Sequence, residues 1–192
     1  MSEINQLQER WKTEEGNRIM QSVLTQRFDL THQEKVELSS DGLITDLRGI
    51  DLSGRELKGY LVGDTDFRWA NLKNCSLTDP LFEANFSFVD FSNSFLKHCD
   101  IWDTKVKSAN FEGATLQKLL FVNADARNAS FRNAKLESVE FQYTDLRGAS
   151  FDGTVFENCR FFRVKLDMKN KEIWEKFNEK QCVLKFVEWC EP

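Results

Sequence analysis

From Phe86 to Leu166 the sequence places an apolar residue at every fifth position without exception. Helices repeat their apolar residues about every 3.6 positions and half-buried strands about every 2, so a period of five belongs to neither. It requires a backbone that turns a corner every five residues and directs the same side chain inward each time. The series reads Phe86, Phe91, Leu96, Ile101, Val106, Phe111, Leu116, Phe121, Ala126, Phe131, Leu136, Phe141, Leu146, Phe151, Phe156, Phe161 and Leu166.

A second inward position lies two residues before each member of that series. Its residues are small, and only Leu119 is large. A narrow tube has room for one large and one small side chain on each side, because close packing penalises a bulkier residue. The other three positions of each repeat are expected to face water.

This register, as in Ala84-Asn85-Phe86-Ser87-Phe88, resembles the A(D/N)LXX motif of the pentapeptide-repeat proteins. The resemblance covers Ile44 to Met168, about two-thirds of the chain. In that family four pentapeptides form one square coil, and the coils stack as a right-handed quadrilateral β-helix. The resemblance therefore implies an all-β solenoid of about six coils, roughly 30 Å long at ~4.8 Å per coil.

The repeat continues upstream of Phe86, one residue out of phase. Leu77 and Leu81 are four residues apart, across Asp79-Pro80, and proline favours turns because it lacks the N–H that a strand ladder needs. We interpret this as one corner with a deleted residue. The alternative is a single nine-residue step from Leu77 to Phe86 with a small bulge.

The N-terminal region, residues 1–43, is predicted to be a helical cap, because a solenoid end exposes an apolar cross-section and free strand edges. Apolar residues from Ile4 to Phe28 recur at three- and four-residue steps, and Gly16 is a candidate interruption. A second short helix over 31–38 and a turn at 39–42 would lead into the repeats.

The repeat domain itself spans 44–168, and residues 169–192 form a C-terminal helix or extension. Lys169 to Lys180 has helical spacing of its apolar residues, which predicts a second helical cap. Cys182 to Trp189 is mostly apolar and is compatible with either a helix or a strand.

Residues that carry chemistry are sparse. The histidines, His32 and His98, are far apart, and the sequence has no CxxC pair, HExxH motif or Gly-rich phosphate loop. Asp100 and Asp103, which flank Trp102, come nearest to a carboxylate pair and are interpreted as solvated surface. A packed rod also lacks a natural cleft. We therefore expect no catalytic, cofactor-binding or metal-binding residues, and no enzyme activity.

The composition is that of a soluble domain in a reducing compartment. No apolar run approaches the ~20 residues of a membrane span, and the first residues lack the basic start and apolar core of a signal peptide. Of the five cysteines, Cys75, Cys99 and Cys159 occupy small inward positions, where they act as compact apolar residues. We expect free thiols and a cytoplasmic protein without membrane contact.

The outward positions become informative when residues twenty apart are stacked. One column then holds Phe82, Trp102, Val122, Gln142 and Phe162, and polar residues would be expected there. An exposed apolar strip of this kind marks an interaction site. Its occupant is one of three: the protein's own terminal helices, a second copy in a homodimer, or a foreign protein. The candidate interaction face consists of Leu61, Phe82, Trp102, Leu120, Val122, Tyr143 and Phe162.

A second side is charged. Asp46/Arg48, Asp66/Arg68, Asp125/Arg127 and Asp145/Arg147 place opposite charges on either side of one inward residue, which predicts columns of Asp beside columns of Arg. Lys105 and Lys107 interrupt the pattern. Surface pairs of this kind are weak, at ~0–1 kcal/mol each.

The best-known members of the family protect DNA gyrase from quinolones, and their acidic rods imitate duplex DNA. Here the 44–168 region has 18 acidic and 16 basic residues, so a dense negative field is not expected. A basic stripe for nucleic acid is also missing. The sequence favours a non-enzymatic scaffold or adaptor that presents a flat face to an unidentified protein. The alternative is a DNA-mimicking modulator of DNA gyrase.

Overall fold

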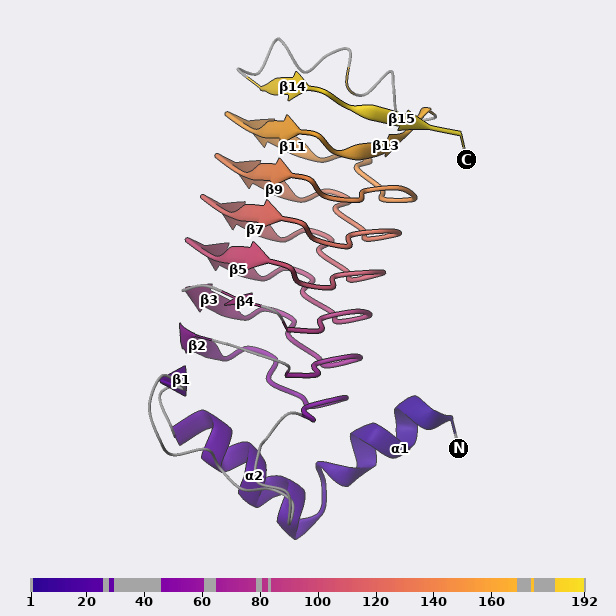
Figure 1. Ribbon diagram of the computed structural model, residues 1–192. Coiled ribbons are helices and arrows are strands. Elements are labelled where there is room, and N and C mark those ends of the chain that lie inside the picture. The colour runs from indigo at the N-terminus through magenta and orange to yellow at the C-terminus, as the bar shows by residue number, and fades with distance from the viewer. Residues whose placement is uncertain are drawn as a thin grey trace.

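The computed structural model describes residues 2–25, 28–29, 46–60, 65–78, 81–82, 84–168, 174 and 182–191. These residues form a tall β-solenoid of about six turns whose strands stack from one end to the other, with two helices at the N-terminal end (Figure 1). The strand pairs are parallel, as repeated coils require. The predicted solenoid is therefore confirmed.

One side of the solenoid is a seven-stranded sheet that runs the length of the molecule. Residues facing each other in adjacent coils are usually twenty apart in the chain, as Leu96↔Leu116 and Leu116↔Leu136 are. In spatial order its strands are β1 (Phe28–Asp29), β2 (Glu56–Tyr60), β3 (Ser76–Thr78), β5 (Phe95–Lys97), β7 (Thr115–Gln117), β9 (Lys135–Glu137) and β11 (Val155–Glu157).

A second side is a six-stranded sheet, and a two-stranded sheet of β13 (Lys165–Asp167) and β15 (Glu188–Cys190) adds to a third side. Isolated parallel bridges, such as Asp125↔Asp145 and Ser130↔Ser150, join the coils where no named strands pair. The six strands are β4 (Leu81–Phe82), β6 (Asp100–Trp102), β8 (Leu120–Val122), β10 (Glu140–Gln142), β12 (Arg160–Phe162) and β14 (Val183–Lys185), in that spatial order.

One coil is a residue shorter than the others. Leu77 faces Leu96, a step of nineteen residues, whereas Leu81 faces Ile101, a step of twenty. The missing residue therefore lies between β3 and β4. Leu81 pairs with Ile101 at the usual spacing of twenty residues, so it belongs to the regular series. This confirms a corner with one deleted residue and rules out a single nine-residue step.

The core consists of columns of stacked rings. Phe91, Phe111, Phe131 and Phe151 lie nearly parallel, with successive centroids 5.0, 5.0 and 5.1 Å apart. These separations match the ~4.8 Å spacing of paired strands, because each ring sits directly above its counterpart one coil below. The rings are essentially inaccessible to solvent. The prediction that Phe111 and Phe131 share one column is confirmed.

The small inward positions are buried as well. Alanines occupy many of them, and hydroxyl residues there donate to backbone carbonyls: Ser94 Oγ to Leu72 O at 2.6 Å and Thr144 Oγ1 to Gln142 O at 3.1 Å. Cys75, Cys99 and Cys159 are buried free thiols, as predicted. A buried hydroxyl is tolerated only because it finds such an acceptor.

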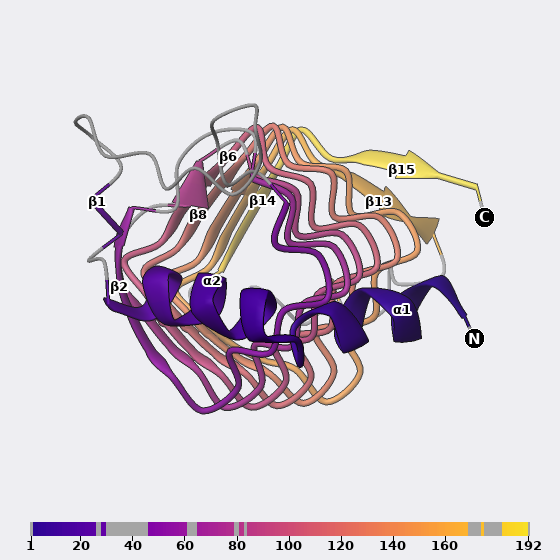
Figure 2. The same ribbon diagram turned by 90° about the horizontal axis from the view of Figure 1, so that it is seen from below.

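Two helices close the N-terminal end of the tube, α1 (Glu3–Arg10) and α2 (Glu14–Thr25), and Figure 2 shows them lying across its mouth. The break between them falls at 11–13. The predicted interruption at Gly16 is wrong: Gly16 lies inside α2 and packs against the backbone of Arg10 and Trp11 so closely that a Cβ would overlap the Arg10 carbonyl oxygen. The helical pattern also ends before Phe28, which lies in strand β1.

The other predicted elements of the N-terminal region, the helix over 31–38 and the turn at 39–42, lie outside the described residues, as does Leu61. At the C-terminal end, Trp174 is buried on the core rings, 4.8 Å from Phe161 and 5.1 Å from Phe151. It is the described residue of the helix predicted at 169–180, and it is helical.

The last described segment resumes the solenoid. Of the two alternatives for Cys182 to Trp189, the strand is correct: β14 pairs with β12 and β15 pairs with β13. The registers Phe161↔Leu184 and Leu166↔Trp189 show that these apolar residues continue inward columns of the repeat. This coil was not predicted, because the residues between Leu166 and Cys182 break the five-residue step.

Candidate interaction surface

The charged face is the side whose outward columns contain Asp46, Asp66, Asp125 and Asp145 beside Arg48, Arg68, Arg127 and Arg147. Each Asp comes just before an inward residue and each Arg just after it, so the two side chains both point outward and reach each other. The ion-pair distances are 2.9 Å for Asp46–Arg48, 2.6 Å for Asp66–Arg68, 2.7 Å for Asp125–Arg127 and 2.6 Å for Asp145–Arg147. The predicted columns are confirmed.

These pairs are linked between coils. Arg127 Nε lies 4.0 Å from Asp145 on the next coil, and Arg48 Nε lies 4.0 Å from Asp66. The hydrogen bond from the Arg127 guanidinium lowers the pKa of the Asp125 carboxyl below its ordinary value against an opposing effect of burial. On these four coils each aspartate is thus paired with the arginine beside it.

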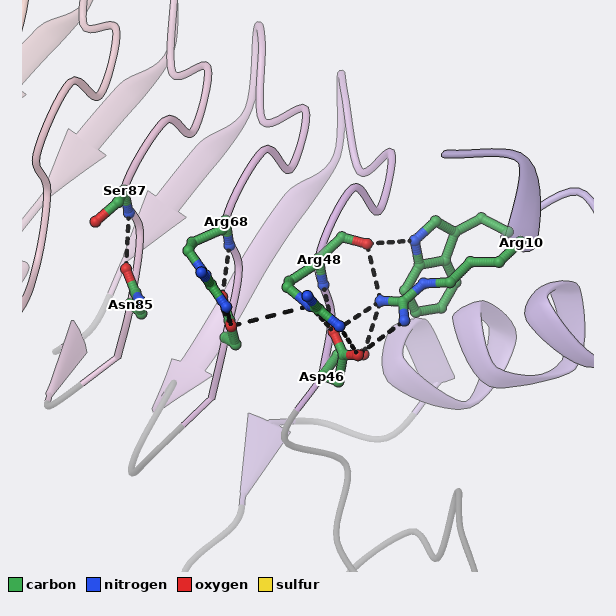
Figure 3. A network of polar contacts seen from close by, with 8 residues as sticks. Arg10, Asp46, Arg48, Arg68, Asn85 and Ser87 are labelled. Carbon is green, nitrogen blue, oxygen red and sulfur yellow. Dashed lines mark hydrogen bonds and ion pairs between the residues drawn. The ribbon is translucent and has the colours of Figure 1, made fainter. Parts of the chain in front are cut away.

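The N-terminal helices attach to this face (Figure 3). Arg10 donates to both Asp46 carboxylate oxygens at 2.9 Å and to the Arg48 carbonyl oxygen at 2.8 Å. Trp11 Nε1 donates to the same carbonyl at 2.8 Å. Burial alone would raise the pKa of Asp46, but the hydrogen bonds from Arg48 and Arg10 outweigh it and hold this pKa well below its usual range. The network fixes the cap on the first coil.

The middle of the charged face lacks this pairing. Asn85 and Ser87 replace the acid and the base on one coil, where the Ser87 N–H donates to Asn85 Oδ1 at 3.1 Å. Lys105 and Lys107 stand on the next. Acids and bases therefore stand side by side on the paired coils, and Lys105 and Lys107 form a small basic spot between them.

The apolar face is the outer surface of the six-stranded sheet. Trp102, Val122, Gln142 and Phe162 face one another in successive coils, as predicted, and Phe82 stands in the same backbone register on β4. Trp102 is 44% exposed and Tyr143 48%. Leu120, Val122 and Phe162 are half-buried. Since α1 and α2 cover the end of the tube, they do not cover the apolar face. The C-terminal helix, the other predicted cover, lies outside the described residues except for Trp174.

The structure extends the apolar face by two residues that the sequence-based reading missed. The guanidinium of Arg163 lies 5.6 Å from the Tyr143 ring, 5.5 Å from Phe162 and 5.9 Å from Phe186. Phe186 is 70% exposed. We name these four residues the aromatic cluster. The twenty-residue spacing could not place Phe186 in this cluster, because Phe186 stands 23 residues after Arg163, in the last coil.

A second aromatic pair was also missed. Trp69 and Phe88 stack with centroids 5.6 Å apart at a corner beside the charged face, and Arg68 lies over the Trp69 ring. Both backbones have positive φ, 61° and 63°, a conformation that bulky residues adopt at a cost. Spacing gave a signal here: both residues stand two after an inward phenylalanine.

Across the described ranges, no group of three or more His, Cys, Asp or Glu residues is placed to hold a metal ion. Burial raises the pKa of the Asp100 carboxyl above its ordinary value, and the nearby His98 opposes that shift. Within the same described part of the chain, no helix is both long and apolar enough to span a membrane.

Two family models match the chain, one described as a pentapeptide repeat region over residues 102–170 and one as pentapeptide repeats in eight copies over residues 81–117. The match falls on the coils whose inward columns are most regular. The chain is a pentapeptide-repeat protein. No curated protein matches its sequence significantly.

Solved structures of other pentapeptide-repeat proteins are similar at low identity. QnrB1, a plasmid-mediated fluoroquinolone resistance protein, is 18% identical with a TM-score of 0.42, over 62% of this chain and 63% of that one. Rfr23 from the cyanobacterium Cyanothece 51142 is 17% identical with a TM-score of 0.32, over 89% and 95%. A protein of the Arabidopsis thaliana thylakoid lumen is 22% identical with a TM-score of 0.30, over 60% and 63%. Identities this low say nothing about what the chain binds.

Proposed function

We propose that this protein is a non-enzymatic scaffold or adaptor that presents its apolar face to a protein partner. The observation that carries the proposal is the exposure of large apolar side chains on one flat sheet: Trp102, Tyr143 and Phe186 lie on it in adjoining columns. Large aromatic residues dominate the energetics of protein interfaces.

The solenoid supplies a rigid support for such a face. Because the inward rings of β8, β10 and β12 are locked in a stacked column, the outward residues of these strands are held at a fixed spacing from coil to coil. A surface that is ordered before binding loses less conformational entropy when the partner docks. This favours a binding role that needs no rearrangement of the chain.

The alternative is a modulator of DNA gyrase that imitates duplex DNA, which requires a dense negative surface. The arginine column of the charged face lies within ion-pair distance of the aspartate column, and this favours the scaffold. An assay of gyrase supercoiling tests the alternative: we expect no inhibition and no protection from quinolones at protein concentrations well above that of the enzyme.

The compartment belongs to the same proposal. All five cysteines, three of them at inward small positions, are free thiols. This is the ordinary state in a reducing environment, and we infer a cytoplasmic protein. Fractionation of native cells, with the chain detected by antibody, tests the assignment.

The test of the scaffold is affinity capture from the native host with matched variants. Trp102→Asp places a charge within the apolar face, and Phe95→Asp makes the same change at a residue of similar exposure, 38%, on the seven-stranded sheet. We expect Trp102→Asp to lose captured proteins that wild type and Phe95→Asp both retain. Equal capture by all three would contradict the proposal.

A further inference from the structure

The charges that border the apolar face are segregated by sign. Asp100 and Asp103 flank Trp102 at the β6 level, towards the N-terminal end. Arg160 and Arg163 flank Phe162 at the β12 level, towards the C-terminal end. The same repeat positions thus carry acids on one coil and bases three coils further on.

This arrangement is symmetric about the middle of the sheet. The strand order β4-β6-β8-β10-β12-β14 has its centre between β8 and β10. A two-fold axis parallel to the strands at that point pairs β6 of one copy with β12 of the other. It also places each position of the five-residue repeat opposite the same position in the other copy, so that Asp103 faces Arg163 and Trp102 faces Phe162.

We propose that the partner of the apolar face is a second copy of this chain, docked face to face and antiparallel, with Asp100 and Asp103 of each copy opposite Arg160 and Arg163 of the other. The proposal rests on the scaffold function above and names its partner. An interface of this type is isologous, and it closes as a dimer without leaving a free copy of the surface.

Asp103 and Arg163 are the charges most available for pairing. Among the described residues neither Asp103 nor Arg163 forms an ion pair, and the Arg163 guanidinium lies over aromatic rings. Asp100 is half-buried beside His98 with a raised pKa, so a facing cation would relieve its desolvation. Glu140, near the centre, already accepts from Gln142 and Arg160 and is thereby neutralised.

The opposite orientation is disfavoured by the same residues. A two-fold axis along the solenoid would place β6 against β6, with Asp100 facing Asp103, and β12 against β12, with Arg160 facing Arg163. Like charges brought together at an interface cost several kcal/mol in such arrangements. The distribution of charge therefore selects the antiparallel dimer.

The size of the face sets the strength of the association. Six strands at ~4.8 Å and five residues at ~3.3 Å give a side of roughly 29 by 16 Å, so two copies would bury on the order of 900 Å². This lies at the low end of specific interfaces, which corresponds to a weak, reversible dimer. Because its specificity comes from ion pairs, the association should weaken as salt is added.

The test is sedimentation velocity on the full chain over a micromolar to submillimolar concentration series. Asp103→Arg and Arg163→Asp should each raise the dissociation constant about tenfold or more, because each places like charges opposite each other twice. An equimolar mixture of the two variants should recover association near the wild-type level, since both contacts become complementary again. The control is Lys118→Asp, which changes an exposed residue at the corner that follows β7, as Asp103 follows β6.

Circular dichroism verifies that each variant is folded. If Arg163→Asp does not fold, Asp100→Arg and Arg160→Asp provide a second complementary pair. Wild type that stays monomeric at every concentration, or a mixture that associates no better than its components, overturns the dimer. In that case, loss of captured host proteins by Trp102→Asp leaves the scaffold standing with a foreign partner. If Trp102→Asp changes neither self-association nor capture, both proposals fail.

Discussion

Phe131 sits at the centre of the stacked core, and its replacement by alanine probes what holds the solenoid together. The ring lies between Phe111 and Phe151, at 5.0 and 5.1 Å, and meets Phe121 and Phe141 edge-on at 6.4 and 5.9 Å. It is fully buried. Truncation of a buried phenylalanine costs about 3–5 kcal/mol through lost burial and the cavity left behind.

We expect the upper end of that range for Phe131→Ala. Four ring contacts are lost at once, each worth ~0.5–1.5 kcal/mol beyond burial, and the fixed coil spacing limits collapse around the cavity. Urea denaturation followed by circular dichroism measures the free energy of unfolding. Phe95→Ala, at a half-exposed position, is the control, and we expect a change of about 1 kcal/mol or less.

The cavity should also divide the stack. In a solenoid each coil contacts only its neighbours, so a weak coil in the middle lets the two ends unfold separately. We expect a shallower urea transition for Phe131→Ala than for wild type. A cost below about 2 kcal/mol with an unchanged transition slope would contradict stabilisation of the solenoid by the stacked columns.

Three further predictions concern other parts of the fold. Gly148→Ala should cost more than Gly54→Ala, although both have φ near 70°, because a Cβ at Gly148 overlaps Asn128 Oδ1 while Gly54 faces open space; thermal unfolding compares them. Leu119→Ala should open a void that Ala126→Leu partly fills, so a double-mutant cycle should give a non-additive free energy, and strict additivity would contradict the coupling. Arg127 lowers the pKa of Asp125 in the folded state. The ion pair therefore contributes its full stabilisation above the ordinary carboxyl pKa of ~3.9, and this stabilisation is lost as the pH falls through the lower, folded-state pKa. Asp125→Asn should therefore flatten the loss of stability in acid; an unchanged profile would contradict the sign.

The regular part of the fold was predictable because one rule governs it. A five-residue step determines both which residues point inward and which residues share a column, so Phe111 above Phe131 and Trp102 above Val122 follow from counting. The same counting located the deleted residue before Leu81. The charged face followed for the same reason, since Asp125 and Arg127 flank one inward position.

Counting failed where the chain leaves the period. Gly16 looked like a helix breaker, but it serves as a close-contact site on Trp11, which depends on packing that spacing does not encode. Phe186 completes the aromatic cluster from a coil that resumes at Val183, so its alignment with Phe162 could not be counted. The occupant of the apolar face depends on tertiary exposure, which the sequence pattern leaves open.

We infer that the apolar face is where this protein binds. Hydroxyl-radical footprinting with mass spectrometry tests it directly, by comparing the free chain with the associated state. We predict that Trp102, Tyr143 and Phe186 lose reactivity on association, while Phe88 and Phe95, whose exposed fractions are similar to that of Trp102, keep theirs. Protection of Phe88 or Phe95 with Trp102 unchanged would contradict it.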